Sequence, residues 1–336
     1  MSNSERKKAD YAEHLSGDLF SDTIEQAPIR KGFGQGLVEA GTADPNVVAL
    51  CADLTESTQI EPFAKAFPER FIEVGVAEQN LVTVASGLAA GGKIPFCSSY
   101  AAFSPGRNWE QIRTTVCLNE QPVKIVGSHA GLSVGPDGAT HQMLEDIALM
   151  RVLPHMTVVV PCDSEEARKA TIALAKTNAP AYLRLAREKS PLITTKDSPF
   201  RIGKADIWRN GADATVIVAG PLAYEAIKAV EALAKKGVDI ELINCHTIKP
   251  LDIETIVKSA AKTRAVVTVE EGQIYGGLGS VIAETLAQHQ PTAMEMVGVA
   301  DVFGQSGTVT ELWEHYGLSA SHIVGAIGRV LERKGK

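Results

Sequence analysis

From Pro28 onward, short apolar runs rich in β-branched residues alternate with amphipathic segments of helical length. This alternation predicts an α/β fold built on parallel sheets. The predicted strands of a first sheet are almost entirely apolar, which is typical of strands that helices cover on both faces. They lie at 47–50, 93–99, 123–128, 157–161 and 181–186.

A polar stretch with two prolines interrupts this alternation after position 187, and three further apolar runs follow it. Such a break favours a linker between two domains. The charged start of the chain shows little periodicity, so we expect an extension that packs weakly or contacts a partner. The expected units are an N-terminal extension at 1–27, a first parallel-sheet domain at 28–190, a linker at 191–212 and a second parallel-sheet domain at 213–336.

The composition narrows the class of protein. The chain has 336 residues, 45% of them hydrophobic, which suits two globular domains. Its net charge of -7 and the lack of a long Lys/Arg run argue against a nucleic-acid partner. It contains no apolar run of about 18 residues and no secretory signal, so we expect no membrane partner and a cytoplasmic location. Five widely spaced cysteines without a CxxC pair predict core thiols.

Two glycine-rich loops raise the alternative of a nucleotide-binding dehydrogenase. The run at 32–36 has no strand before it, which a dinucleotide fingerprint requires. The run at 276–280 does lie between a predicted strand and a predicted helix, but its fingerprint is incomplete. A tight strand-to-helix turn is therefore the favoured explanation, and NAD(H) binding remains the alternative.

A carboxylate opens an otherwise apolar helix in the first domain. Glu78 comes after the run FIEVGVA at 71–77 and opens a predicted helix whose other residues, at 81–90, are almost entirely small or apolar. A charge at a helix start is explained by the helix dipole alone. Burial of this carboxylate would instead favour proton exchange near neutral pH.

The loop at 127–142 is rich in polar and glycine residues. It contains His129, Asp137, His141 and four glycines, and it follows the predicted strand at 123–128. The carboxyl end of a parallel strand is where α/β proteins bind their ligands. The spacing of the two histidines matches no tight metal motif, so the loop predicts polar substrate binding.

These motifs together resemble the C-terminal half of transketolase. The resemblance rests on GVAEQN at 75–80, the GPDGATHQ run at 135–142, EEGQIYGGLGS at 270–280 and VFGQSGT at 302–308, and it covers about residues 28–334. It implies the pyrimidine-binding domain and the C-terminal domain of a thiamine diphosphate enzyme. The chain looks most like the separately encoded C-terminal subunit of a split transketolase.

The resemblance also implies residues that bind the cofactor. Glu78 is expected to hydrogen-bond N1' of the aminopyrimidine and so to activate the cofactor. Phe103 is expected to stack on the aminopyrimidine, with Tyr100 as the alternative because the spacing of this loop departs from that of the family. Val76 resembles the residue that supports the bent cofactor, and Asp53 resembles an aspartate near the thiazolium.

A second set of residues is expected to bind the sugar. His141 and Asp137 match residues that contact sugar hydroxyls, and His141 is also expected to act in catalysis. The phosphate of the sugar is expected to bind a clamp made of Arg30, Ser57, His129 and Arg187. Guanidinium, hydroxyl and imidazole groups are chemically suited to phosphate.

The chain lacks the GDG start of the diphosphate and Mg2+ site found in this superfamily. We therefore expect no metal ligands in this chain, and a partner N-terminal transketolase subunit that supplies them in an α2β2 assembly. The expected reaction moves a two-carbon ketol unit from a ketose phosphate to an aldose phosphate.

Other functions remain open. They are the β subunit of a 2-oxo acid dehydrogenase, a 1-deoxyxylulose 5-phosphate synthase, a transketolase for sulfonated or branched sugars, and a non-catalytic partner subunit.

Overall fold

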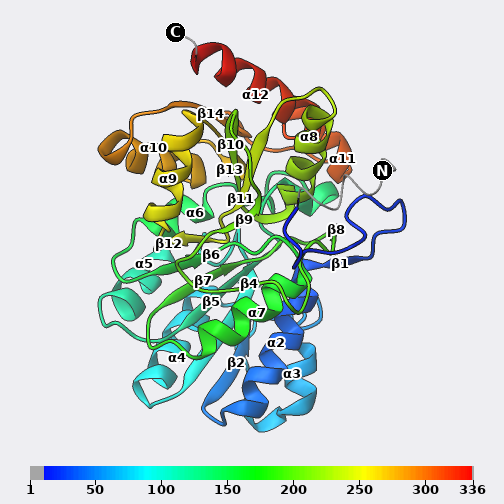
Figure 1. Ribbon diagram of the computed structural model, residues 1–336. Helices are drawn as coiled ribbons and strands as arrows, with labels where there is room; N and C mark the ends of the chain where they lie inside the picture. The colour runs from blue at the N-terminus through cyan, green and yellow to red at the C-terminus, as the bar shows by residue number, and fades with distance from the viewer. Residues whose placement is uncertain (1–10, 335–336) are drawn as a thin grey trace.

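The computed structural model describes residues 11–334 and shows two α/β units, with the C-terminal unit uppermost in Figure 1. The lower unit is built on a seven-stranded sheet in the order β12-β6-β7-β5-β4-β2-β3. Its parallel strands are β2 (Val47–Cys51), β3 (Phe71–Glu73), β4 (Ile94–Tyr100), β5 (Lys124–Ser128), β6 (Thr157–Val159) and β7 (Ala181–Arg184). The parallel sheet predicted from the apolar runs is confirmed.

Helices cover both faces of this sheet. They are α2 (Ile29–Ala43), α3 (Glu61–Ala66), α4 (Glu78–Ala90), α5 (Trp109–Gln111), α6 (Asp146–Arg151) and α7 (Ser164–Ala175). The short helical segments are η1 (Pro68–Arg70), η2 (Ile112–Cys117) and η3 (Leu132–Asp137). The glycine run at 32–36 lies inside α2, where a Cβ at Gly32 would sit 1.7 Å from the carbonyl oxygen of Ser164. Gly32 and Gly36, which face α7, therefore allow α2 and α7 to pack side by side (Figure 1).

The upper unit has a five-stranded sheet in the order β14-β13-β10-β11-β9. Its strands are β9 (Asp206–Arg209), β10 (Ala214–Val218), β11 (Ile240–Asn244), β13 (Ala265–Gln273) and β14 (Ala293–Val299), of which only β9 runs antiparallel to its neighbour. Its helical segments are η4 (Gly220–Leu222), α8 (Ala223–Ala234), α9 (Ile253–Thr263), α10 (Leu278–His289), α11 (Val309–His315) and α12 (Ala320–Lys334).

The two units share elements. Strand β9 lies within the stretch predicted as a linker, 191–212, and pairs with β11. Strand β12 (Thr247–Lys249) comes from the second unit but pairs antiparallel with β6 of the first sheet. A two-stranded sheet of β1 (Gln26–Pro28) and β8 (Lys189–Pro191) joins the start of the chain to the end of the first unit.

The described part of the N-terminal segment, residues 11–27, packs closely rather than weakly. Tyr11, Leu15 and Leu19 are buried in the core of the second unit. Apolar side chains lose contact with water there, which stabilises the folded state. The expectation of a weakly packed extension is therefore wrong for these residues, and residues 1–10 lie outside the described part.

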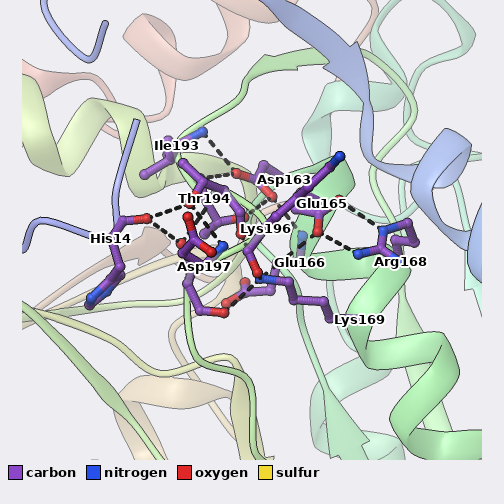
Figure 2. Close-up of polar contacts among 12 residues, drawn as sticks. His14, Asp163, Glu165, Glu166, Arg168, Lys169, Ile193, Thr194, Lys196 and Asp197 are labelled. Carbon is purple, nitrogen blue, oxygen red and sulfur yellow. Dashed lines mark hydrogen bonds and ion pairs between the residues drawn. The ribbon is translucent and has the colours of Figure 1, made fainter. Parts of the chain in front are cut away.

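A cluster of polar contacts ties α7 to the linker and to the N-terminal segment (Figure 2). Asp163 caps α7 and also accepts hydrogen bonds from the backbone nitrogens of Ile193 and Thr194. Glu166 accepts one from the backbone nitrogen of Cys162, at 2.7 Å, and one from the side chain of Asn244 in β11, also at 2.7 Å. Burial and the nearby Asp163 raise the pKa of Glu166 to about 8.

Two further sequence expectations concern cysteines and membranes. All five cysteines are buried free thiols, as predicted. Within residues 11–334, no helix combines the length and the apolar character needed to cross a membrane.

Candidate active site

The predicted site residues follow neighbouring parallel strands. Asp53 follows β2, Val76 follows β3, Tyr100 ends β4, His129 follows β5 and Arg187 follows β7. Because β3, β2, β4, β5 and β7 are adjacent and parallel, their carboxyl ends meet at one edge of the sheet. The topology therefore gathers these residues, which are far apart in the sequence.

Glu78 is the first residue of α4, and its side chain is buried, with 3% exposed. Its two carboxylate oxygens contact the hydroxyl of Ser99, at 3.4 Å, and the guanidinium of Arg107, at 3.2 Å. The side chain of Asn108 donates to the backbone oxygen of Glu78 at 2.8 Å. The burial agrees with the expectation from the apolar helix, and the result is a rigidly held hydrogen-bond acceptor.

Aromatic side chains lie beside this carboxylate. The rings of Tyr100 and Phe103 are stacked with their centroids 6.0 Å apart, and the ring of His141 lies 5.4 Å from that of Phe103. The guanidinium of Arg107 lies over the Phe103 ring at 4.4 Å. The sequence analysis did not predict a role for Arg107, which contacts both Glu78 and the ring of Phe103. Its position four residues after Phe103 was the available signal.

Arg30 and His129 form the buried part of the predicted phosphate clamp. Arg30 donates to the backbone oxygen of Ser57 at 2.9 Å and to Nε2 of His129 at 2.8 Å. Because a guanidinium can only donate, Nε2 accepts and Nδ1 carries the proton that it donates to Ser128, at 2.9 Å. Burial and the charge of Arg30 lower the pKa of His129 to about 3, so this imidazole is neutral.

Arg187 is the remaining guanidinium of the predicted clamp, and it contacts the 129–142 loop. It donates to the backbone oxygen of Val134 at 2.7 Å and lies 3.5 Å from the carboxylate of Asp137. Burial and, after it, the positive charge of Arg187 lower the pKa of Arg30. The buried Nε of Arg30 has no hydrogen-bond partner among the described residues. An anion between two such groups would relieve their repulsion.

Asp53 and Val76 lie at the same edge but make different contacts. The backbone nitrogen of Asp53 donates to the carboxylate of Glu73 at 2.7 Å, in a left-handed conformation with φ of 58°. Val76 is 72% exposed. Their expected roles beside the cofactor therefore stay predictions.

The second glycine-rich loop surrounds a buried carboxylate. Glu270 accepts hydrogen bonds from the backbone nitrogens of Leu278 and Gly279, both at 2.8 Å, at the start of α10. A Cβ at Gly277 would lie 1.9 Å from this carboxylate. The backbone nitrogens that a dinucleotide phosphate would need at this helix start are thus already bound to the carboxyl group of Glu270, which argues against the dehydrogenase alternative.

The site residues fit the pyrimidine end of thiamine diphosphate. Glu78 offers a buried acceptor for a ring nitrogen, and the partly exposed rings of Tyr100 and Phe103 offer a stacking face. Within residues 11–334, no group of three or more His, Cys, Asp or Glu side chains is arranged to hold a metal. The partner ligands for Mg2+ stay a prediction.

The fold and this edge of the sheet define a thiamine-type pyrimidine-binding unit joined to a second α/β unit. Residues 25–191 match the transketolase pyrimidine-binding domain, and residues 203–323 match the transketolase C-terminal domain. The chain therefore belongs to the transketolase family, which implies dependence on thiamine diphosphate.

Three relatives in this family are similar to this chain along almost their full length. A 6-deoxy-6-sulfo-D-fructose transketolase subunit from Clostridium sp. (strain MSTE9) is 41% identical, over 94% of this chain and 98% of the relative. A putative transketolase C-terminal section from Methanocaldococcus jannaschii is 43% identical, over 91% of this chain and 97% of the relative. A solved structure described as a split-gene transketolase, inactive beta4 tetramer, has a TM-score of 0.86 and 43% identity, over 91% of this chain and 99% of that chain.

Proposed function

We propose that this chain is the C-terminal subunit of a two-subunit transketolase. It transfers a two-carbon ketol unit from a ketose phosphate to an aldose phosphate, with thiamine diphosphate held between this chain and an N-terminal subunit in an α2β2 assembly. The N-terminal subunit supplies the diphosphate and Mg2+ ligands, and the assembly is cytoplasmic.

One observation carries the proposal. A single edge of the first sheet brings together a buried carboxylate, two aromatic rings and the guanidiniums of Arg30 and Arg187. When bound, thiamine diphosphate supplies the nucleophilic carbon and the electron sink for the transferred unit. The chain's residues then have to hold the pyrimidine ring, exchange its proton and anchor the phosphate of the sugar.

Glu78 suits the first two tasks. Its buried carboxylate is held by Ser99 and Arg107, so it presents a fixed acceptor to a ring nitrogen and can share a proton there. Tyr100 or Phe103 supplies the stacking face, and the guanidinium over Phe103 keeps that ring in place. Val76 and Asp53 complete the cofactor side in this proposal.

We propose that the sugar lies between the 129–142 loop and Arg30. We propose that His141, beside Phe103, and Asp137, beside Arg187, contact its hydroxyls, and that His141 also acts in catalysis. In the clamp of Arg30, Ser57, His129 and Arg187, the guanidiniums and the Ser57 hydroxyl bind the terminal anion, and His129 contributes by holding Arg30 through Nε2. Because a sulfonate and a phosphate are both tetrahedral anions, the same clamp suits the sulfonated sugar named for the Clostridium relative.

The need for a second subunit is supported by the relatives. The names of two of them describe a subunit and a C-terminal section, and the solved relative made of one kind of chain is described as inactive. A non-catalytic role is disfavoured, because such a subunit has no use for a buried carboxylate beside stacked aromatic rings.

Glu78→Gln tests the proposal in the enzyme reconstituted with its N-terminal subunit. The substitution keeps the size of the side chain but removes the carboxylate, so turnover should fall by about 100-fold or more. The matched control is Glu61→Gln, which removes an exposed carboxylate paired with Lys65 and should leave turnover unchanged. Near-wild-type turnover for Glu78→Gln would refute the role of Glu78 in activating the cofactor.

A further inference from the structure

The sugar-binding loop, defined here as residues 129–142, is held by the C-terminal unit rather than by its own unit alone. Gln142 donates to the backbone oxygen of Gln305 at 3.0 Å. A Cβ at Gly138 would lie 2.7 Å from the hydroxyl of Ser306, so the two segments are in close contact. The second unit thus packs directly against the sugar-binding loop.

Glu271 makes the most direct of these contacts. It lies in β13, and its side chain is 1% exposed. One carboxylate oxygen accepts from the backbone nitrogen of Ser133 at 2.7 Å and from the indole of Trp313 at 2.8 Å. The other accepts from the hydroxyl of Ser133 at 3.0 Å. Three donors therefore converge on one buried carboxylate, two of them from the loop.

The loop is shaped to admit this carboxylate. Gly131 has a φ of 85°, a conformation that favours glycine, and a Cβ there would lie 2.2 Å from a carboxylate oxygen of Glu271. Arg184, at the end of β7, donates to the backbone oxygens of Glu271, at 2.8 Å, and Met143, at 3.3 Å. The guanidinium of Arg184 thus holds β13, which bears Glu271, next to the residue that follows the loop.

The contact between Glu271 and Ser133 is linked to the candidate active site through the next residue, Val134. The backbone oxygen of Val134 accepts the hydrogen bond that orients Arg187. Asp137 ends η3 and His141 lies in the turn that follows it, so both come after Ser133 along the same loop. A shift of Ser133 would therefore move the groups proposed to bind the sugar.

We propose that Glu271 is a positioning residue that sets the shape of the sugar-binding loop from the C-terminal unit. This inference rests on the proposed function for its meaning, and it gives the second unit a role in substrate affinity. Glu271 touches neither sugar nor cofactor and acts through Ser133 and Val134.

The chain offers a matched control for this role. Glu270 is the preceding residue of β13, is equally buried, and also accepts two backbone hydrogen bonds, but these come from the start of α10. Neighbouring residues of a strand point to opposite faces, so Glu270 does not touch the loop. Glu270→Ala and Glu271→Ala remove the same group from the same strand.

The first measurement is amide hydrogen exchange on this chain alone. Glu271→Ala should speed exchange at 132–142, while Glu270→Ala should speed it at the start of α10 and leave the loop as in the wild type. Equal exchange of the loop in the two variants would overturn the proposal. This measurement needs no activity, so it decides the positioning role even if the chain transfers no ketol group.

The second measurement uses the reconstituted enzyme. Glu271→Ala should raise KM for the sugar phosphate by about tenfold or more, with a smaller change in kcat, because small displacements of binding groups are costly. Glu271→Gln should restore a KM close to that of the wild type, since its carbonyl oxygen still accepts from Ser133 and Trp313. A KM for Glu271→Ala equal to that for Glu270→Ala would contradict the proposal.

Two milder variants serve if Glu271→Ala fails to fold. Ser133→Ala and Trp313→Phe each remove one of the three donors. Each should raise KM in the same direction by a smaller factor, and an unchanged KM in both variants would overturn the proposal.

Discussion

Glu166 links the stability of this chain to pH, because its carboxyl lies buried between the two units. Its hydrogen-bond donors are the backbone nitrogen of Cys162 and the side chain of Asn244, which belongs to the other unit. Its buried neighbours include the carboxyl of Asp163 and the thiol of Cys162. Glu166→Gln keeps the shape and the acceptor for Cys162 but stays neutral at every pH.

The direction in which pH changes the stability follows from the pKa of Glu166, which burial raises from 4.5 to about 8. Between these values the folded chain keeps a proton on Glu166 that the unfolded chain releases. The contribution to stability is therefore complete below pH 4.5 and is lost as pH rises through 8. At about 1.4 kcal/mol for each pKa unit, the loss amounts to about 5 kcal/mol.

Urea unfolding of the wild type and Glu166→Gln at pH 5, 7 and 9 measures this effect. The two proteins should be similar in stability at pH 5, and the variant should be more stable than the wild type by a few kcal/mol at pH 9, of the order estimated above. Asp163 and the buried thiols titrate in both proteins, so the difference between the proteins isolates Glu166. A constant difference across the three pH values would refute the reasoning.

Three further predictions concern the clamp, the stacking face and the N-terminal segment. Arg187→Ala should raise KM about 10- to 100-fold for a sugar phosphate but not for the unphosphorylated sugar, and equal effects on both would contradict the clamp. Tyr100→Leu and Phe103→Leu should each raise the thiamine diphosphate concentration needed for half-maximal activity in steady-state assays. The rise should be larger for the residue whose ring stacks on the pyrimidine. Equal small rises in the two variants would show that neither ring stacks on it. Leu15→Ala should lower the free energy of unfolding by about 2–4 kcal/mol in urea titrations, whereas the exposed control Leu118→Ala should change it by less than about 0.5 kcal/mol. Equal stabilities for these last two variants would show that the N-terminal segment does not stabilise the core.

Apolar patterning was sufficient to predict the main strands, because a strand covered on both faces needs a continuous apolar run. It did not predict β14, which contains Glu295, or the short strands β3, β9 and β12, which are three or four residues long and contain polar or charged residues. The sheet places these short strands at or next to its edges, where burial is less complete and the pattern is weaker. The described N-terminal segment was misjudged for a similar reason, since three apolar residues spaced by four do not form a long periodic run.

Only the site residues that come directly after predicted strands could be placed together from the sequence. His129 and Arg187 follow apolar runs, so their shared edge could be expected from the parallel sheet. The partners of these groups could not, because Arg30 lies 99 residues from His129 and Glu271 lies 138 residues from Ser133. Contacts over such separations depend on how the two units pack, which local pattern does not encode.

The central claim is that this chain holds only the pyrimidine half of the cofactor site. Calorimetric titration of thiamine diphosphate with Mg2+ into this chain alone, and into its equimolar mixture with the N-terminal subunit, tests it most directly. We predict tight binding in the mixture and no tight binding to the isolated chain. Tight binding by the isolated chain, accompanied by ketol transfer, would contradict the account.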